Sequence, residues 1–249
     1  SKPVSSILFL KKRSHLVPIA QNASAQPYGY DQMDSTLISG SFDGMLCIWD
    51  IPTMSLIKII PHGRNEVNGQ LNRDGAIVSL ATDCDETFIA VGFMKGVVGI
   101  YDITFSQPMN SFTAHDEYLL SVQMVPGESA IITTSQDKTA KLWRLYGVSS
   151  CKKVFSSHKD YVICSSIAHP QIGVVKGNQH TIQENTLMLT GSKDETLKGW
   201  NRKSGDELFT IVGHKNTLFE IMHHPSEMSF VSCSGDGLVC LWDYKSPPY

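Results

Sequence analysis

The sequence lacks the features that mark membrane, secreted and metal-binding proteins. It has no run of about 18 apolar residues, the length that a membrane-spanning helix needs. The segment "SSILFL" has neither the length nor the cleavage signal of a secretory peptide. The six cysteines form no CxxC pair and have no companion histidine at the spacing of a zinc site. We therefore expect a cytoplasmic protein in a reducing compartment, with no membrane insertion and no bound metal.

An excess of either charge is also missing. The chain has 21 Lys and Arg against 24 Asp and Glu, a formal net charge of -3. Its only basic run, Lys11-Lys12-Arg13, is short. Nucleic acids and anionic membranes are therefore not favoured as partners. With 41% hydrophobic and 18% charged positions, the 249 residues can bury a sizeable core.

What the sequence does contain is one sequence motif in five imperfect copies. The copies are "ISGSFDGMLCIWDI", "AVGFMKGVVGIYDI", "TTSQDKTAKLWRL", "TGSKDETLKGWNR" and "CSGDGLVCLWDY". Their aromatic residues are Trp49, Tyr101, Trp143, Trp200 and Trp242, with spacings of 52, 42, 57 and 42 residues. A repeat of this length predicts stacked copies of one supersecondary unit.

Each copy carries the signal of a tight hairpin. An aspartate stands six residues before four of the aromatics, at Asp43, Asp137, Asp194 and Asp236, and Lys95 takes its place in the second unit. In two copies a glycine follows the aspartate between alternating apolar residues, a strong hairpin signal. The alternation predicts that one face of each sheet packs against the next unit.

Histidines and hydroxyls recur at fixed distances from the tryptophans. His115 and His214 each lie 28 residues before a tryptophan, and His158 lies 42 before Trp200, an excess that we assign to a polar insertion. Hydroxyls recur ten and eight residues before the tryptophans, at Ser39, Ser41, Thr133, Ser135, Thr190, Ser192, Ser232 and Ser234. A buried indole N–H and a buried imidazole need partners, since an unpaired group costs about 1 to 3 kcal/mol.

With these positions the chain resembles the WD-repeat β-propeller family. "VGH" ending at His214 and "LWD" at 241–243 lie close to the family motif, whereas Tyr101, Trp143-Arg144 and Trp200-Asn201 depart from it. In that family, His, Ser or Thr, Asp and Trp form a network that ties the inner strands of a blade together. The implied residues are His115, Ser135 or Thr133, Asp137 and Trp143; His158, Ser192, Asp194 and Trp200; His214, Ser234, Asp236 and Trp242; and Asp43 and Trp49 in the first unit.

The resemblance implies an all-β fold, a β-propeller of four-stranded antiparallel blades. We place five blades at about 4–60, 66–113, 115–157, 158–212 and 214–244, with loop insertions at about 11–35, 63–73 and 171–185. Closed propellers have typically 4 to 8 blades, and about seven is common in this family. We therefore expect part of a larger propeller and a natural protein longer than 249 residues.

Recurring Ser, His and Asp also raise the possibility of a hydrolase. Catalysis needs one constellation with an exposed nucleophile, whereas here the trio comes in several copies at one register and no GxSxG elbow exists. No glycine-rich phosphate loop is present either. We expect no enzyme, and no catalytic, cofactor-binding or metal-binding residue and no small-molecule substrate. His169-Pro170 and His223-His224-Pro225 are predicted to be turn residues rather than metal ligands.

The resemblance implies that partners dock on the face formed by the loops before the first strand and between the second and third strands. The candidate partner-binding residues on that face are Phe42, Met94, Tyr118, Gln136, Tyr161 and Lys193. An alternative is that these side chains only pack over neighbouring loops.

These observations predict a non-enzymatic scaffold that binds other proteins in a larger intracellular complex. One alternative is a reader that captures a peptide or a modified tail at the top face of the propeller. Another is the non-catalytic domain of a larger enzyme. The extended, mismatched repeats resemble those of large intracellular assembly proteins, including cytoskeletal and ciliary ones.

Overall fold

The computed structural model describes residues 3–10, 36–61, 75–83, 85–102, 108–145, 149–168, 176–177, 180–181, 186–224 and 227–244. The expected insertions at 11–35 and 63–73, and the His169-Pro170 pair, lie outside these residues, as does all of 171–185 except two short strands. The chain divides into two compact units, Ser1–Met94 with Val98–Ser111, and Lys95–Val97 with Phe112–Tyr249.

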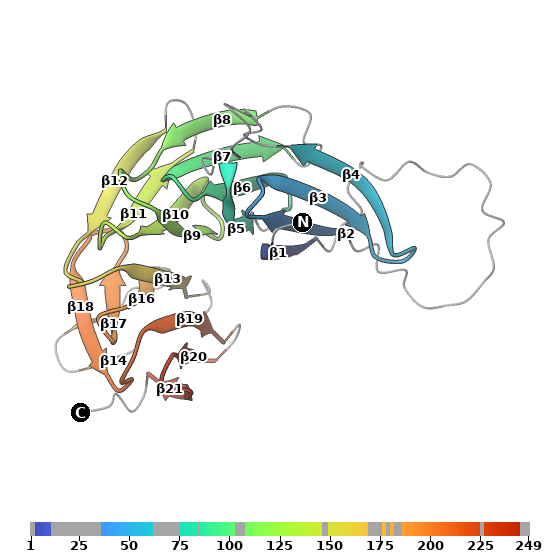
Figure 1. The fold of residues 1–249 in the computed structure, drawn as a ribbon. Coiled ribbons are helices and arrows are strands. Elements are labelled where there is room, and N and C mark those ends of the chain that lie inside the picture. The colour runs from blue at the N-terminus through green and yellow to red at the C-terminus, as the bar shows by residue number, and fades with distance from the viewer. Residues whose placement is uncertain are drawn as a thin grey trace. The chain divides into compact units, whose positions relative to one another are not determined.

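The first unit contains two four-stranded antiparallel sheets (Figure 1). Blade 1 consists of β1 (Val4–Leu10), β2 (Thr36–Ser41), β3 (Met45–Asp50) and β4 (Ser55–Pro61), paired in that order. Blade 2 consists of β5 (Ile77–Thr82), β6 (Phe88–Phe93), β7 (Val97–Asp102) and β8 (Pro108–Thr113), also in chain order.

The two blades of this unit are joined at their first strands. Ser5 Oγ of β1 donates a hydrogen bond to the carbonyl of Ile77 at 2.5 Å, and the N–H of Leu80 donates to Ser6 Oγ at 3.1 Å. Ile38 and Ile77 are fully buried. Hydrogen bonds between serine hydroxyls and the backbone therefore hold β1 against β5.

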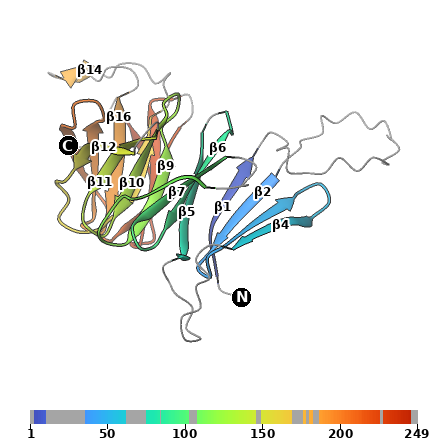
Figure 2. The ribbon, with the colours of Figure 1, turned by 90° about the horizontal axis from the view of Figure 1, so that it is seen from above.

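The second unit contains three larger sheets and a two-stranded ladder. Blade 3 is β9 (Leu119–Met124), β10 (Ala130–Ser135), β11 (Ala140–Arg144) and β12 (Ser150–Phe155), whose strands are seen side by side in Figure 2. Blade 4 is β13 (Val162–Ile167), β16 (Leu187–Ser192), β17 (Thr196–Asn201) and β18 (Glu207–Val212), with β14 (Lys176–Gly177) and β15 (His180–Thr181) between its first two strands. Blade 5 is β19 (Leu218–His223), β20 (Ser229–Ser234) and β21 (Val239–Asp243).

The predicted fold class is confirmed. Among the described residues every sheet is antiparallel, and four of the five blades have four strands. Each copy of the motif covers the end of a second strand, a hairpin turn and the third strand. The residue after the turn aspartate or Lys95 has a positive φ in every blade: Gly44, Gly96, Lys138, Glu195 and Gly237.

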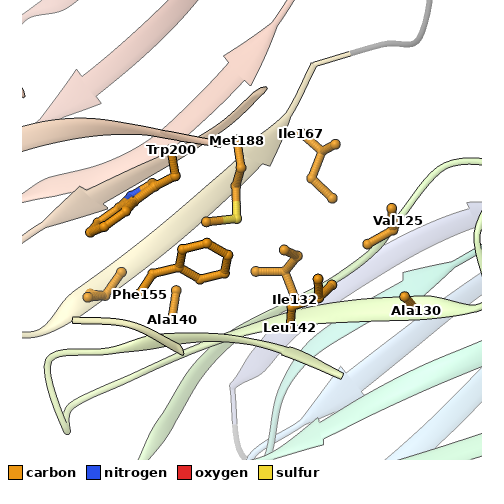
Figure 3. Packing of buried hydrophobic residues seen from close by; sticks show 10 residues of the cluster. Val125, Ala130, Ile132, Ala140, Leu142, Phe155, Ile167, Met188 and Trp200 are labelled. Atoms are coloured by element: carbon orange, nitrogen blue, oxygen red, sulfur yellow. The ribbon is translucent and has the colours of Figure 1, made fainter. Parts of the chain in front are cut away.

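Apolar side chains fill the boundary between blades 3 and 4. Ile132 and Phe155 of blade 3 meet Met188 and Trp200 of blade 4 in one buried cluster (Figure 3). The rings of Phe155 and Trp200 lie edge to face with centroids 5.4 Å apart. Burying each such side chain stabilises the fold by about 1.5 to 3 kcal/mol. A second cluster, which includes Leu189 and Phe230, joins blades 4 and 5.

Blade 5 also has an exposed face. Met222, Val231 and Leu241 lie opposite one another on its three strands and are 64%, 37% and 75% exposed. Within the described part of the chain, β21 pairs only with β20. In the same residues, no helix has the length and hydropathy to cross a membrane.

Candidate functional site

A chain of side-chain hydrogen bonds runs through blade 3. His115 Nδ1 lies 2.6 Å from Asp137 Oδ2, and His115 Nε2 lies 2.7 Å from Thr133 Oγ1. The indole N–H of Trp143 donates to the same Thr133 oxygen at 3.0 Å. With a neutral imidazole all three contacts can form. Nδ1–H donates to the carboxylate, Nε2 accepts from the threonine hydroxyl, and the threonine oxygen accepts the indole N–H.

Blades 4 and 5 repeat this chain. His158 lies 2.9 Å from Asp194 and 2.8 Å from Thr190, which accepts the indole N–H of Trp200 at 2.8 Å. His214 lies 2.9 Å from Asp236 and 2.8 Å from Ser232. Ser232 in turn accepts the indole N–H of Trp242 at 2.8 Å. In each blade the joining hydroxyl is the one ten residues before the tryptophan.

The hydroxyls eight residues before the tryptophans make different hydrogen bonds. Ser135 Oγ donates to the carbonyl of Tyr118 at 2.9 Å and accepts the N–H of Asp137 at 3.1 Å. Ser192 and Ser234 bond in the same way to the loop before the first strand and to the turn aspartate. These serines join the hairpin turn to that loop and do not contact the tryptophan N–H.

In the first unit, Trp49 donates its indole N–H to Ser39 Oγ at 2.9 Å, and Asp43 accepts the N–H of Met45 at 3.2 Å. Val91 and Phe93, both buried, occupy the corresponding hydroxyl positions of blade 2. Blade 2 therefore differs from the other blades in its hydrogen bonds, because buried apolar side chains occupy both hydroxyl positions.

Hydrogen bonds lower the pKa of two turn aspartates of the second unit, Asp137 and Asp236. Burial opposes the charge on Asp137, but hydrogen bonds from His115 and Thr139 outweigh it and lower the pKa of Asp137 to about 2. For Asp236, the N–H of Lys215 is the leading cause that lowers the pKa to about 2. The three joining hydroxyls, Thr133, Thr190 and Ser232, are buried and bonded to both the histidine and the tryptophan of their blade, so these groups link strands within the blade.

Two pairs of the candidate partner-binding residues lie together. The N–H of Gln136 donates to the carbonyl of Tyr118 at 2.9 Å, and the Tyr118 side chain is exposed. The N–H of Lys193 donates to the carbonyl of Tyr161 at 2.9 Å. Its ammonium lies 4.6 Å from the centre of the Tyr161 ring and 3.5 Å from the carboxylate of Asp160.

The other two candidates lie in the first unit, at the same place in their blades. Phe42 donates its N–H to the carbonyl of Pro3 at 3.3 Å, and its side chain is exposed. Met94 donates its N–H to Ala76 at 2.7 Å and is half-buried. The structure places each candidate beside the loop before a first strand.

One buried ion pair escaped the sequence analysis. Arg202 of blade 4 is only 1% exposed, and its guanidinium donates to both carboxylate oxygens of Glu128 in blade 3 at 2.9 and 3.0 Å. The hydrogen bond from Arg202 is the leading cause that lowers the pKa of Glu128. The available signal was the place of Arg202, two residues after a blade tryptophan.

The prediction that His223 is a turn residue is wrong. His223 is the last residue of β19 and is buried, whereas His224 is the exposed residue that follows the strand. The imidazole of His223 lies 2.7 Å from Ser166 Oγ and 2.7 Å from Tyr244 Oη. Pro225 lies outside the described residues.

Comparisons with known proteins agree with these repeats. The chain is 28% identical over 122 residues to nuclear distribution protein PAC1 of Ajellomyces capsulatus, covering 45% of this chain and 26% of that protein. It is 27% identical over 263 residues to nuclear distribution protein nudF 1 of Talaromyces marneffei, covering 84% and 55%. It is 22% identical over 232 residues to the WD repeat domain-containing protein 83 homolog of Dictyostelium discoideum, covering 85% and 66%. The chain thus spans less than two thirds of the length of these relatives.

The family model of the WD domain, G-beta repeat, matches three segments, residues 28–50, 106–144 and 205–243. These segments end one residue after Trp49, Trp143 and Trp242, at the last residue of the third strand of blades 1, 3 and 5. Three segments of the chain therefore match the WD repeat, and the five antiparallel blades agree with the blades of a β-propeller.

Proposed function

We propose that this chain is a non-enzymatic scaffold that binds other proteins within a larger intracellular complex. The observation that carries the proposal is the pairing of side chains beside the hairpin turns, exposed Tyr118 with half-buried Gln136 and half-buried Tyr161 with exposed Lys193. The histidines and aspartates nearby are engaged in the repeated structural ties. The side chains that remain for a partner are those on the surface, so a partner would bind by surface contact.

The geometry of these pairs suits protein recognition. Tyrosine is enriched among the residues that dominate binding energy, since its large ring loses little conformational freedom on binding. The Lys193 ammonium over the Tyr161 ring restricts that ring further. Backbone bonds to the turns hold both tyrosines at defined places, so less freedom remains to be lost when a partner docks.

We also propose that further blades cover the exposed face of blade 5. In blade 4, Leu189 and Leu197 are buried against blade 5, whereas their repeat equivalents Val231 and Val239 are 37% and 74% exposed. Equivalent apolar positions call for an equivalent covering sheet. If so, Leu241→Glu destabilises the natural protein but not the 249-residue chain, and equally small effects in both would contradict this proposal.

The relatives support the intracellular part of the proposal. Two of them carry names that refer to nuclear distribution, and a third is named for its WD repeats. We propose that the chain works in the cytoplasm.

The test combines cross-linking of the natural complex with matched variants. Tyr118→Ala, Tyr161→Ala and Lys193→Glu should each release cross-linked partner proteins, whereas Lys152→Ala on the exposed outer strand β12 should not. Melting temperatures should stay close to that of the wild type for all four. Partners retained in every variant, or stability lost without loss of a partner, would mean that these residues only pack the loops.

A further inference from the structure

One position of the repeat carries a histidine in blade 5 and an aliphatic residue in its neighbours. In blade 3, Ile131 lies between Trp143 and Met124; in blade 4, Met188 lies between Trp200 and Ile167. In blade 5 the same row places Phe230 between Trp242 and His223. The three first-strand residues Met124, Ile167 and His223 are all buried, at 6%, 7% and 8% exposure.

The contacts of His223 cross the boundary between two blades. Nδ1 lies 2.7 Å from Ser166 Oγ of β13 in blade 4, and this oxygen also accepts the N–H of His223 at 3.2 Å. Nε2 lies 2.7 Å from the hydroxyl of Tyr244, which follows β21. The imidazole and the Tyr244 ring are stacked, 18° apart with centroids at 6.0 Å.

We propose that Ser166, His223 and Tyr244 form an acid-sensitive junction, which holds blade 5 on blade 4 while His223 is neutral. The neutral ring has one donor and one acceptor, and two hydroxyls satisfy both. The junction is distinct from the repeated tie of blade 5, which uses His214, Asp236 and Ser232.

The surroundings of His223 offer no opposite charge among the described residues. Ser166, Phe230 and Tyr244 face the ring, and burial raises the pKa of the Tyr244 phenol well above its usual range. Glu220 lies three residues before His223, and Asp243 lies one residue after Trp242. Because both offsets are odd, these two carboxylates lie on the opposite face of the sheet.

The remaining ionisable groups near the strand end point elsewhere. His224 is exposed, and its Nδ1 accepts the N–H of Glu227. His115, His158 and His214 differ from His223 because each contacts an aspartate carboxylate. A proton on His223 would therefore be a buried charge without a partner charge, which is unfavourable.

The direction of the effect follows from the pKa. Burial lowers the pKa of His223 from its usual 6.5 to about 4. Between these values the unfolded or detached strand binds the proton and the packed strand does not. The contribution of the junction to the stability of blade 5 on blade 4 is therefore complete above pH 6.5, and it is lost as the pH falls from 6.5 toward 4.

The first test uses the wild-type chain and follows amide hydrogen exchange at pH 7.5 and 5.0, corrected for the intrinsic exchange rate. Protection of β13 and β19 should fall about 10- to 30-fold more than that of β10 and β11. Equal changes in both regions would overturn the proposal. Histidine ring resonances give an independent readout, and finding no histidine that stays neutral at pH 5.5 would also overturn it.

The second test uses a substitution that the chain itself supplies. His223→Met introduces the residue that blade 3 carries at this position and should abolish the extra loss of protection at pH 5.0. His224→Gln, on the exposed neighbour, should leave that loss unchanged. A pH effect of wild-type size in His223→Met would assign the acid sensitivity to another group and refute the junction.

Discussion

Arg202 of blade 4 and Glu128 of blade 3 are joined by two parallel hydrogen bonds, although 74 residues separate them in the sequence. The guanidinium is almost fully buried, whereas the carboxylate is partly exposed. Tyr244 occupies the same blade position as Arg202, two residues after the tryptophan, and it too bonds across strands to His223. The position two residues after the tryptophan therefore makes a different polar contact in blade 4 and in blade 5, whereas the hydrogen bonds between His, Asp, hydroxyl and Trp recur in both blades.

Glu128→Gln should destabilise the chain by about 1 to 3 kcal/mol, because it removes the carboxylate charge that faces the buried Arg202 guanidinium. Urea denaturation measures the change, with exposed Glu117→Gln as the control. The double variant Glu128→Gln with Arg202→Met should recover much of the loss. A Glu128→Gln effect as small as that of the control would contradict the role of the pair.

Thr190→Val should cost about 2 to 4 kcal/mol, since it keeps the side-chain shape but leaves Trp200 Nε1 and His158 Nε2 without a partner. Exposed Thr113→Val is the matched control and should be close to neutral. The free energy of unfolding from urea titration compares the two. Similar values for both variants would mean that Thr190 contributes little to the blade.

Gly96 and Gly237 form a natural comparison, since both follow the turn position at φ values of 81° and 82°. A Cβ on Gly96 would lie 2.0 Å from the carbonyl oxygen of His115, whereas a Cβ on Gly237 meets nothing within 4 Å. Gly237→Ala should therefore cost about 1 kcal/mol from backbone conformation alone, and Gly96→Ala clearly more. Thermal unfolding of the two variants decides this, and equal losses would argue against the clash.

Lys138 and Glu195 occupy the same turn position with φ of 68°, a region that L-residues adopt at a cost. Lys138→Gly and Glu195→Gly should each stabilise the chain by about 0.5 to 1 kcal/mol, because glycine adopts this conformation without strain. Melting temperatures report the gain. Lys152→Gly, within strand β12, should lower the melting temperature instead.

Acid should weaken blade 3 through Asp137. Its pKa in the folded chain is about 2, below the ordinary 3.8, so its contribution is present above pH 3.8 and is lost as the pH falls toward 2. Asp137→Asn should lower stability at neutral pH and reduce the slope of stability between pH 4 and 2. Urea titrations across this range give the slopes, and parallel curves for wild type and variant would contradict the assignment.

The amino-acid sequence predicted the repeated elements because they depend on local chemistry. The hairpins were readable from an aspartate at a fixed distance from an aromatic residue, and the strands from alternating apolar positions such as Leu46 and Ile48. The tie between His, Asp and Trp was implied by spacing and by the family resemblance. Spacing left open which of two hydroxyls joins them, since Thr133 and Ser135 lie two residues apart on one strand.

The sequence by itself determined the all-β repeat, the hairpin turns and the residues that can form polar ties within a blade. Only the tertiary structure decided what crosses from blade to blade. His223 is bonded to Ser166, 57 residues away, and Arg202 to Glu128. Such contacts depend on how one sheet packs on the next, and no local period records them. The physical reason is that periodicity fixes which face of a strand is buried, whereas packing selects the side chain that it meets.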